Sequence, residues 1–302
     1  MSTVSGMALA LLSFALLTSV DTIFKLMVAD HPIYQILFTN GCFALIPIFI
    51  WAALTGGVRQ RLRTGRFAQH LLRGSISLTS AFLAVFAYSQ LPLTDFYAIV
   101  FAGPLLVTII SVVWLGEKIE WQRWFAILLG FSGIMIVTSP FHNPAEHTPL
   151  VEGTSLLIGR CAAFGSVLCY AFSVVIIRHM RAGETNITFS LYGYVASLTG
   201  SGFLTLLHTK DIAPLSYQDI LHLALSGVLA GISSICLMTA YHRTPASLVA
   251  PFQYTQIIWG AIAGYVLWGQ IPGPTLIVGA VIVALSGLYV IYSEMRFKPV
   301  HS

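Results

Sequence analysis

The chain has 302 residues, of which 57% are hydrophobic and only 9% are charged, and its mean hydropathy is +0.84. A soluble domain carries about 25% charged residues, so this composition excludes a protein that covers its own surface in water and indicates an integral membrane protein. The formal charge of +4 comes from bases in short loops, a pattern that does not favour nucleic-acid binding.

Ten apolar runs follow one another along the chain. Runs of about 20 residues favour transmembrane helices, because barrel strands alternate over only about 10 residues. The predicted spans are roughly 5–28, 33–54, 70–90, 92–115, 121–139, 154–178, 187–207, 219–241, 245–268 and 271–292. The first run lacks a charged n-region and an obvious cleavage site, so we expect a retained helix rather than a signal peptide.

One stretch of the first half is repeated 153 residues later. Residues 88–116 (YSQLPLTDFYAIVFAGPLLVTIISVVWLG) return as 241–269 (YHRTPASLVAPFQYTQIIWGAIAGYVLWG), with a tyrosine, a proline and a glycine at matching positions. A repeat of about half the chain indicates one unit built twice. We therefore expect a single transmembrane domain over 1–302, with repeat one at 1–148 and repeat two at 149–302.

The basic residues predict the orientation. With both termini in the cytoplasm, only Lys25 and Lys210 lie in outer segments, and Arg160 lies within a span. The inner side then holds the other bases: Arg59, Arg61, Arg63, Arg66, Arg73, Lys118, Arg123, Arg178, Arg181, Arg243, Arg296 and Lys298. Each half has an odd number of spans, so the second half is inverted. We expect an all-α integral membrane protein with ten transmembrane helices as two inverted five-helix repeats, an architecture of secondary transporters.

Four motifs of the fourth and fifth spans carry a family resemblance. They are Pro92-Leu-Thr-Asp95, Gly103-Pro104-Leu105, Leu115-Gly116-Glu117-Lys118 and Gly130-Phe131-Ser132-Gly133. The chain resembles the EamA-like, ten-helix members of the drug/metabolite transporter superfamily over nearly its whole length. In the second copy Gln270 replaces Glu117. The resemblance implies a carrier of the inner membrane that exports an amino acid or related metabolite. The alternative that it also implies is an importer of a vitamin or nucleotide-like metabolite, of the riboflavin or S-adenosylmethionine class.

Four ionisable residues lie within the predicted spans toward the outer side: Asp21, Lys25, Asp95 and Arg160. Such groups cost about 2.5–3.5 kcal/mol each near a helix centre and point to function by default. We predict a polar cluster near the outer mouth of a central cavity, which binds a zwitterion or couples transport to protons. The alternative is local neutralisation, in which Lys25 pairs with Asp21 four residues earlier and Arg160 reaches the headgroups.

Further candidates for substrate binding are polar or aromatic residues of the spans: Asn40, Ser80, Tyr97, Phe101, Gln253, Tyr254 and Gln256. For the aromatic residues, packing or lipid contact is the favoured alternative, and for Asn40 it is a structural hydrogen bond between helices. The two glutamines are stronger candidates, because an amide that faces lipid would lack partners. Pro104 and Pro251 interrupt the fourth and ninth spans and are candidate gating hinges, with static kinks as the alternative.

Other function classes fit less well. No GxxxxGK[ST] motif is present, which excludes an ATP-hydrolysing motor of that kind. A lipid-modifying enzyme would need clustered His, Asp or Cys residues, which here are scattered, and a receptor has no obvious use for two-sided access. We expect a non-enzymatic transporter without cofactor or metal. Its expected partners are a small-molecule substrate, protons as a candidate coupling ion and membrane lipids, but no nucleic acid, and it acts as a monomer or homodimer.

Overall fold

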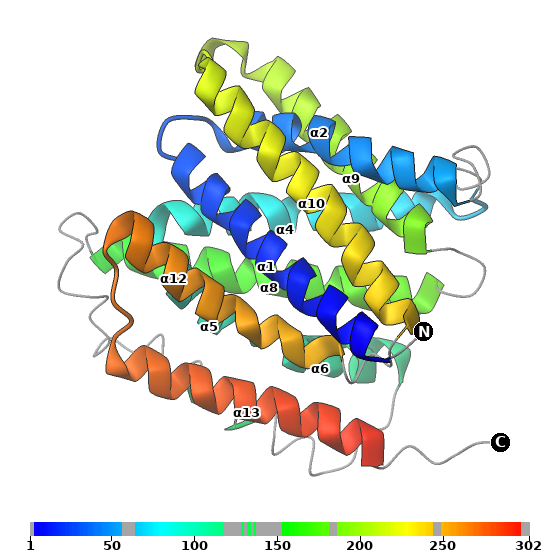
Figure 1. Ribbon diagram of the computed structural model, residues 1–302, viewed down its shortest axis with the longest axis vertical. Coiled ribbons are helices and arrows are strands. Elements are labelled where there is room, and N and C mark those ends of the chain that lie inside the picture. Colours follow the sequence, from blue (N-terminus) through cyan, green and yellow to red (C-terminus); the bar gives the residue numbers. More distant parts are fainter. Residues whose placement is uncertain are drawn as a thin grey trace.

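The computed structural model describes residues 3–55, 64–116, 128–129, 132–133, 136, 153–180, 186–243 and 249–296, which form helices joined by short turns and contain no β-strand. The predicted all-α fold is therefore confirmed. The helices, labelled as in Figure 1, are α1 (Thr3–Met27), α2 (Ile33–Leu54), α4 (Phe67–Gln90), α5 (Leu93–Val100), α6 (Gly103–Leu115), α8 (Gly153–Met180), α9 (Asn186–Leu207), η1 (Thr209–Asp211), α10 (Tyr217–Arg243), η2 (Ala250–Thr255), α12 (Gln256–Trp268) and α13 (Pro274–Arg296), where η marks a 3-10 helix.

Six segments of the described residues are long and apolar enough to cross a membrane: Val4–Met27, Ile33–Leu54, Phe67–Gln90, Leu93–Trp114, Ser155–Ile177 and Tyr217–Leu237. A helix of about 20 residues rises about 30 Å, which matches the hydrocarbon core of a bilayer. Large apolar side chains lie exposed on the bundle, such as Val113 (80% exposed) and Leu206 (74% exposed). In water such a surface would be unfavourable, whereas in lipid it is the expected one.

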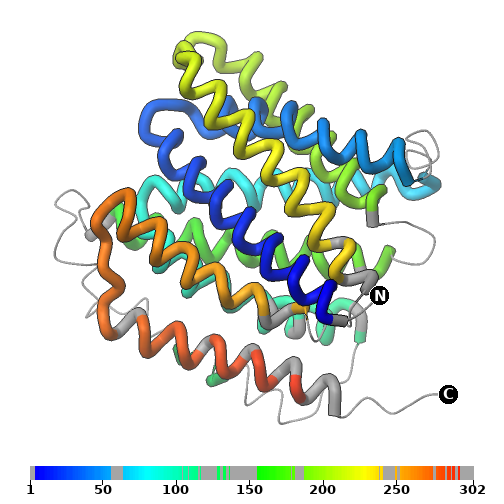
Figure 2. Tube along the Cα trace, in the orientation of Figure 1, coloured from blue at the N-terminus to red at the C-terminus, as the bar shows by residue number. Residues whose placement is uncertain are grey.

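The helices lie side by side in one bundle, and α1 crosses its middle between α10 and α12 (Figures 1 and 2). The start of α1 and the end of α13 lie at one end of the bundle, which we call the termini end (Figure 1). The end of α1, the end of α4, the start of α8 and the end of α12 lie at the opposite end. Residues distant in the sequence therefore meet there.

Helices of the two halves begin and end at equivalent positions. Helix α9 starts and ends 153 residues after α2, and α12 starts and ends 153 residues after α6. Both α6 and α12 stop at a glycine with left-handed backbone, Gly116 (φ 68°) and Gly269 (φ 65°), a conformation that side chains with a Cβ rarely adopt. The packing also corresponds, because the first helix of each half lies against the third long helix of the other half: α1 against α10, and α8 against α4.

The predicted span 92–115 is two helices rather than one. Helix α5 ends at Val100, and α6 begins after Phe101 and Ala102 with Pro104 in its first turn. Proline lacks an N–H and suits a helix start, so here it begins a helix instead of kinking one. In the second half, η2 carries Pro251 in its first turn and leads directly into α12. The predicted span 121–139 lies outside the described residues, apart from a few helical positions.

Helix α5 lies at the centre of the core. All residues from Leu93 to Ile99 are buried, and several of them join a cluster with apolar residues of α1, α2, α4, α6, α8 and α10. A short helix surrounded in this way has every side chain in contact with protein, which holds it in a fixed register. Asp95 and Tyr97 of α5 are therefore held in the interior of the protein.

Close helix approach depends on glycines of α10. A Cβ at Gly227 would lie 2.5 Å from the carbonyl oxygen of Asn40 and 2.6 Å from Cβ of Phe43, both on α2. By contrast, a Cβ at Gly41 would meet Leu198 of α9 at an ordinary 3.6 Å. The sequence pattern GxxxG in α10 therefore serves tight packing against α2.

We predict that Gly227→Ala destabilises the bundle, because backbone and Cβ atoms of α2 have to move away. Overpacking of this kind costs about 1–3 kcal/mol. The melting temperature of the detergent-purified variant should fall by several degrees, as measured by intrinsic fluorescence or a thiol-reactive dye. Gly41→Ala is the matched control and should melt within about a degree of the unmodified protein. Equal melting temperatures for the two variants would contradict the close α2–α10 contact.

Candidate functional site

Lys25 lies in the last turn of α1 and holds the end of α4. Its ammonium donates to the carbonyl oxygen of Tyr88 at 2.7 Å and to that of Leu91. Carbonyls at a helix C-terminus lack partners within the helix and carry partial negative charge, so a lysine is well suited to them. The Lys25 Nζ also lies 5.4 Å from the ring centroid of Trp268, within cation–π range.

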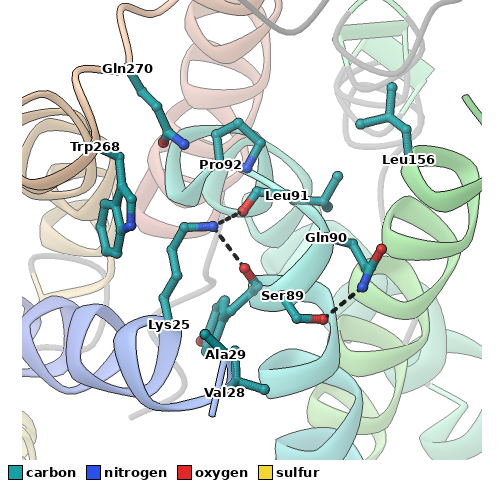
Figure 3. A pocket seen from close by; sticks show the side chains of 11 residues that line it. Lys25, Val28, Ala29, Ser89, Gln90, Leu91, Pro92, Leu156, Trp268 and Gln270 are labelled. Atoms are coloured by element: carbon teal, nitrogen blue, oxygen red, sulfur yellow. Dashed lines mark hydrogen bonds between the residues drawn. The ribbon is translucent and has the colours of Figure 1, made fainter. Parts of the chain in front are cut away.

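A cavity of about 260 Å³ surrounds this lysine at the opposite end of the bundle (Figure 3). The lining comes from α1, the turn between α4 and α5, α8 and the end of α12. Its residues are Lys25, Val28, Ala29, Tyr88, Ser89, Gln90, Leu91, Pro92, Leu156, Trp268 and Gln270. The volume lies just below the range of about 300–1,000 Å³ that is typical of ligand sites. Apolar walls with a few polar groups are also typical of such sites. We call this cavity the Lys25 pocket.

The end of α12 fixes the residues on one side of the Lys25 pocket. The N–H groups of Gly269 and Gln270 return to the carbonyls of Tyr265 and Gly264, each at 3.0 Å. With the left-handed Gly269, these bonds form the hydrogen-bonded stop that is common at helix ends. As a result Trp268, before the glycine, and Gln270, after it, both line the pocket (Figure 3).

A second polar contact lies one turn deeper along α1. The hydroxyl of Tyr97 on α5 donates to Oδ2 of Asp21 at 2.7 Å. Tyr97 is only 1% exposed, and its ring lies against α12, where a Cβ at Gly260 would come within 2.6 Å of two ring carbons. Tyr97 therefore joins α1, α5 and α12 at one point.

The other two charges of the predicted cluster also lie in this region. Asp95, in the first turn of α5 and only 3% exposed, interacts electrostatically with both Lys25 and Arg160 of α8. The structure thus brings together the four ionisable residues that the sequence singled out. It corrects one detail: Asp21 and Lys25 do not neutralise each other, since the carboxylate binds Tyr97 and the ammonium binds backbone carbonyls.

Two of the polar candidates form hydrogen bonds to neighbouring helices and do not line the Lys25 pocket. Asn40 donates to the hydroxyl of Ser226 at 3.0 Å between α2 and α10, and Ser80 donates to the carbonyl of Ser166 at 2.8 Å between α4 and α8. The structural interpretation of Asn40 that the sequence favoured matches this contact. Both residues hold the bundle together in this conformation.

The aromatic candidates of the two halves meet each other. The rings of Phe101 and Tyr254 pack edge to face with centroids 4.8 Å apart. The Tyr254 hydroxyl is buried and forms no hydrogen bond within the described residues. Gln253 is half-buried and Gln256 is buried, and neither lines the Lys25 pocket. These residues lie where α5 gives way to α6 and where η2 gives way to α12.

A second cluster of basic residues, which the sequence analysis did not single out, lies at the termini end. Arg73 of α4 is only 6% exposed, donates to the carbonyl of Phe189 on α9 and lies 5.7 Å from its ring centroid. The neighbouring His70 stacks on Tyr192 of α9 at 4.5 Å, and Arg66 donates to the carbonyl of Met180 at 3.2 Å. The spacing of these bases along α4 is the signal, because Arg66, His70 and Arg73 share one helix face.

Comparisons with known proteins agree with this architecture. The model of the "EamA-like transporter family" matches residues 4–139 and again residues 157–293. A riboflavin transporter of Vibrio cholerae is 28% identical over 80% of this chain and 77% of that protein. An S-adenosylmethionine uptake transporter of Rickettsia prowazekii is 27% identical, over 87% of this chain and 84% of that protein.

Two further comparisons cover nearly the whole chain. A pseudopaline exporter of Pseudomonas aeruginosa is 22% identical, over 93% of this chain and 94% of that protein. A solved crystal structure that is 15% identical superposes with a TM-score of 0.66 over 98% of this chain and 100% of that chain, which shows a common fold. Because the family model matches both halves and most of the residues, this chain belongs to the EamA-like transporter family of membrane proteins.

Proposed function

We propose that this protein is a secondary active transporter that moves a small metabolite across the inner membrane by alternating access. The observation that carries the proposal is the Lys25 pocket, which opens at one end of a membrane bundle and has walls from both halves of the chain. Lys25 and Pro92 belong to the first half, whereas Leu156 and Trp268 belong to the second. A movement of one half against the other would therefore take the site apart, as alternating access requires.

The two-fold organisation of the chain supports ten helices in two inverted repeats. Equivalent helices of the two halves share their bounds at an offset of 153 residues, and the family model matches once in each half. The start of α4 and the ends of α8, α10 and α13 lie at the termini end (Figure 1), and in sequence these segments carry Arg66, Arg73, Arg178, Arg243 and Arg296. Lys25 belongs to the end of α1 and Arg160 to the first turns of α8, toward the opposite end, and Lys210 follows α9. By the positive-inside rule this distribution favours cytoplasmic termini. The Lys25 pocket then faces outward.

The charges near the pocket support an amphoteric substrate. Lys25 and Arg160 supply cations, and Asp21 and Asp95 supply carboxylates, so a zwitterion such as an amino acid finds a partner for each of its charges. We propose export of an amino acid or related metabolite. The alternative is import of a vitamin or nucleotide-like metabolite. The relatives named above include a riboflavin transporter, an uptake transporter and an exporter, so their names favour neither direction.

The contact between Asp21 and Tyr97 is a candidate proton site. A carboxyl group within a membrane span faces a large cost when it is charged and can bind a proton when its partner moves away. The Tyr97 hydroxyl stabilises the carboxylate in this conformation. Movement of α5 against α1 would withdraw that hydroxyl, which links protonation of Asp21 to the conformation of the bundle.

We expect the reconstituted protein to carry flux. Purified protein in proteoliposomes should move at least one member of a labelled panel of amino acids, vitamins and nucleotide-like metabolites, and an imposed pH gradient should change the initial rate severalfold. Liposomes without protein give the background. Protein that melts cooperatively but moves no member of the panel in either direction would contradict the transporter proposal.

Replacement of Asp21 tests the proton site. We expect Asp21→Asn to lower the rate driven by a pH gradient at least about tenfold, because an amide binds no proton in this range. Counterflow of the same substrate, which needs no net proton movement, should persist. An unchanged dependence on the pH gradient would rule out Asp21 as the coupling group.

Replacement of Tyr97 tests the contact itself. Tyr97→Phe removes the 2.7 Å hydrogen bond to Asp21 and should destabilise the protein by about 0.5–2 kcal/mol, as judged from the melting temperature. Tyr254→Phe is the matched control for stability, since that hydroxyl has no hydrogen bond within the described residues. If both variants melt alike, the Asp21–Tyr97 bond contributes nothing to stability.

A further inference from the structure

We infer that the Lys25 pocket binds the anionic group of a ligand beside the face of Trp268, and that Gln270 determines this charge preference. The inference rests on the proposed function and specifies the substrate class of the same site. The ligand is a small molecule with a carboxylate, or an equivalent anion, attached to a planar or apolar body.

The first argument is the hydrogen-bonding capacity of Lys25. An ammonium group has three N–H donors. Two of them are used by the carbonyls of Tyr88 and Leu91, which hold the group in place at the wall of the cavity (Figure 3). Within the part of the chain that the structure describes, one donor therefore remains for a ligand. Asp95 interacts electrostatically with Lys25, but it is shared with Arg160 and does not line the pocket.

The second argument is the charge of the lining. Among the described residues that line the pocket, Lys25 carries the only formal charge, and the remaining polar side chains are neutral amides and hydroxyls. A fixed cation in the wall of an apolar cavity attracts the anionic group of a ligand to that wall, because the low dielectric of the surroundings strengthens the attraction.

The third argument is the geometry at the end of α12. Trp268 and Gln270 flank Gly269, whose left-handed backbone turns both side chains toward the pocket (Figure 3). Trp268 offers an aromatic face next to the cation, and Gln270 offers an amide that donates to an anion as readily as it accepts. An apolar ring of the ligand fits beside the indole while its carboxylate meets Lys25.

The fourth argument is a difference between the two repeats. At the position that corresponds to Gln270, the first repeat has Glu117. A glutamate at 270 would place a second, negative charge in the lining and neutralise Lys25. The glutamine has nearly the same size and lacks the charge, so it keeps the pocket cationic. We therefore regard Gln270 as the residue that determines the charge preference.

The test compares two probes that differ in charge and hardly in size. Indole-3-acetate carries a carboxylate, and indole-3-acetamide carries a neutral amide on the same ring. Binding of each to the detergent-purified full-length protein is measured by calorimetry or with the radiolabelled probe. We expect the acid to bind at least about tenfold tighter than the amide, the factor that one hydrogen bond to a charged group provides. Equal affinities, or no saturable binding of the acid, would overturn the inference.

Two variants of the pocket and one control variant locate the effect. Gln270→Glu should weaken indole-3-acetate about tenfold and leave the amide within about twofold. Gln218→Glu is the matched control, because Gln218 is exposed near the start of α10 at the same end of the bundle and does not line the pocket. It should leave both affinities unchanged. Trp268→Leu should weaken both probes together. Loss of acid binding in Gln218→Glu as well as in Gln270→Glu would assign the effect to general surface charge and overturn the site.

The proposed function and this inference fail separately. Flux of a metabolite in proteoliposomes without the preference for the acid would leave the transporter intact and refute the charge assignment of the pocket. Preference for the acid that Gln270→Glu abolishes, without flux of any panel member, would support the pocket and refute transport.

Discussion

The hydrogen bond between Tyr97 and Asp21 is the contact on which the arrangement at the pocket depends. It ties α5 to α1 at a depth where water is scarce and an unpaired carboxylate would be costly. The Tyr97 ring reaches this position because Gly260 of α12 has no side chain to occupy the same space. One residue thus sets the spacing of three helices. Helix α5 also carries Asp95, which interacts electrostatically with Lys25 and Arg160. The position of α5 against α1 therefore also determines where this carboxylate lies.

Basic side chains within the bundle are stabilised mainly by backbone carbonyls of neighbouring elements. Lys25 binds the end of α4, and Arg66 binds the last carbonyl of α8. Arg73 reaches the carbonyl of Phe189 within the first turn of α9, beside Gly193, where a Cβ would lie 3.1 Å from one guanidinium nitrogen. Such contacts give a cation within the bundle hydrogen-bond acceptors that carry no full charge. They connect helices at both ends of the bundle.

Hydropathy was sufficient to predict most of the helices, and the ionisable residues within the spans drew attention to the region of the pocket. The predicted span 33–54 coincides with α2, because its apolar run is bounded by Pro32 and by polar residues. Pro104 predicted an interruption of the fourth span, but as a hinge or kink within one helix; that the span divides into α5 and α6 could not be predicted, since both sides of the break are equally apolar. Helical spacing alone suggested that Asp21 pairs with Lys25. The true partners come from other helices, and long-range contacts of this kind leave no trace in local spacing. The burial of Arg73 was missed for the same reason.

The two halves correspond in their helix bounds, and they differ both where α6 and α12 begin and at Gln270, which lines the Lys25 pocket. Proline begins α6 after a break, whereas Pro251 lies within a 3-10 helix that continues into α12. In an alternating-access cycle of inverted repeats, each half in turn adopts the conformation of the other, so identical halves would present equivalent sites to both sides. Gln270 in place of a glutamate breaks that equivalence. A ligand that prefers the cationic pocket would then have different affinities at the two membrane faces, and an external gradient, rather than the protein, would still determine the direction of net transport.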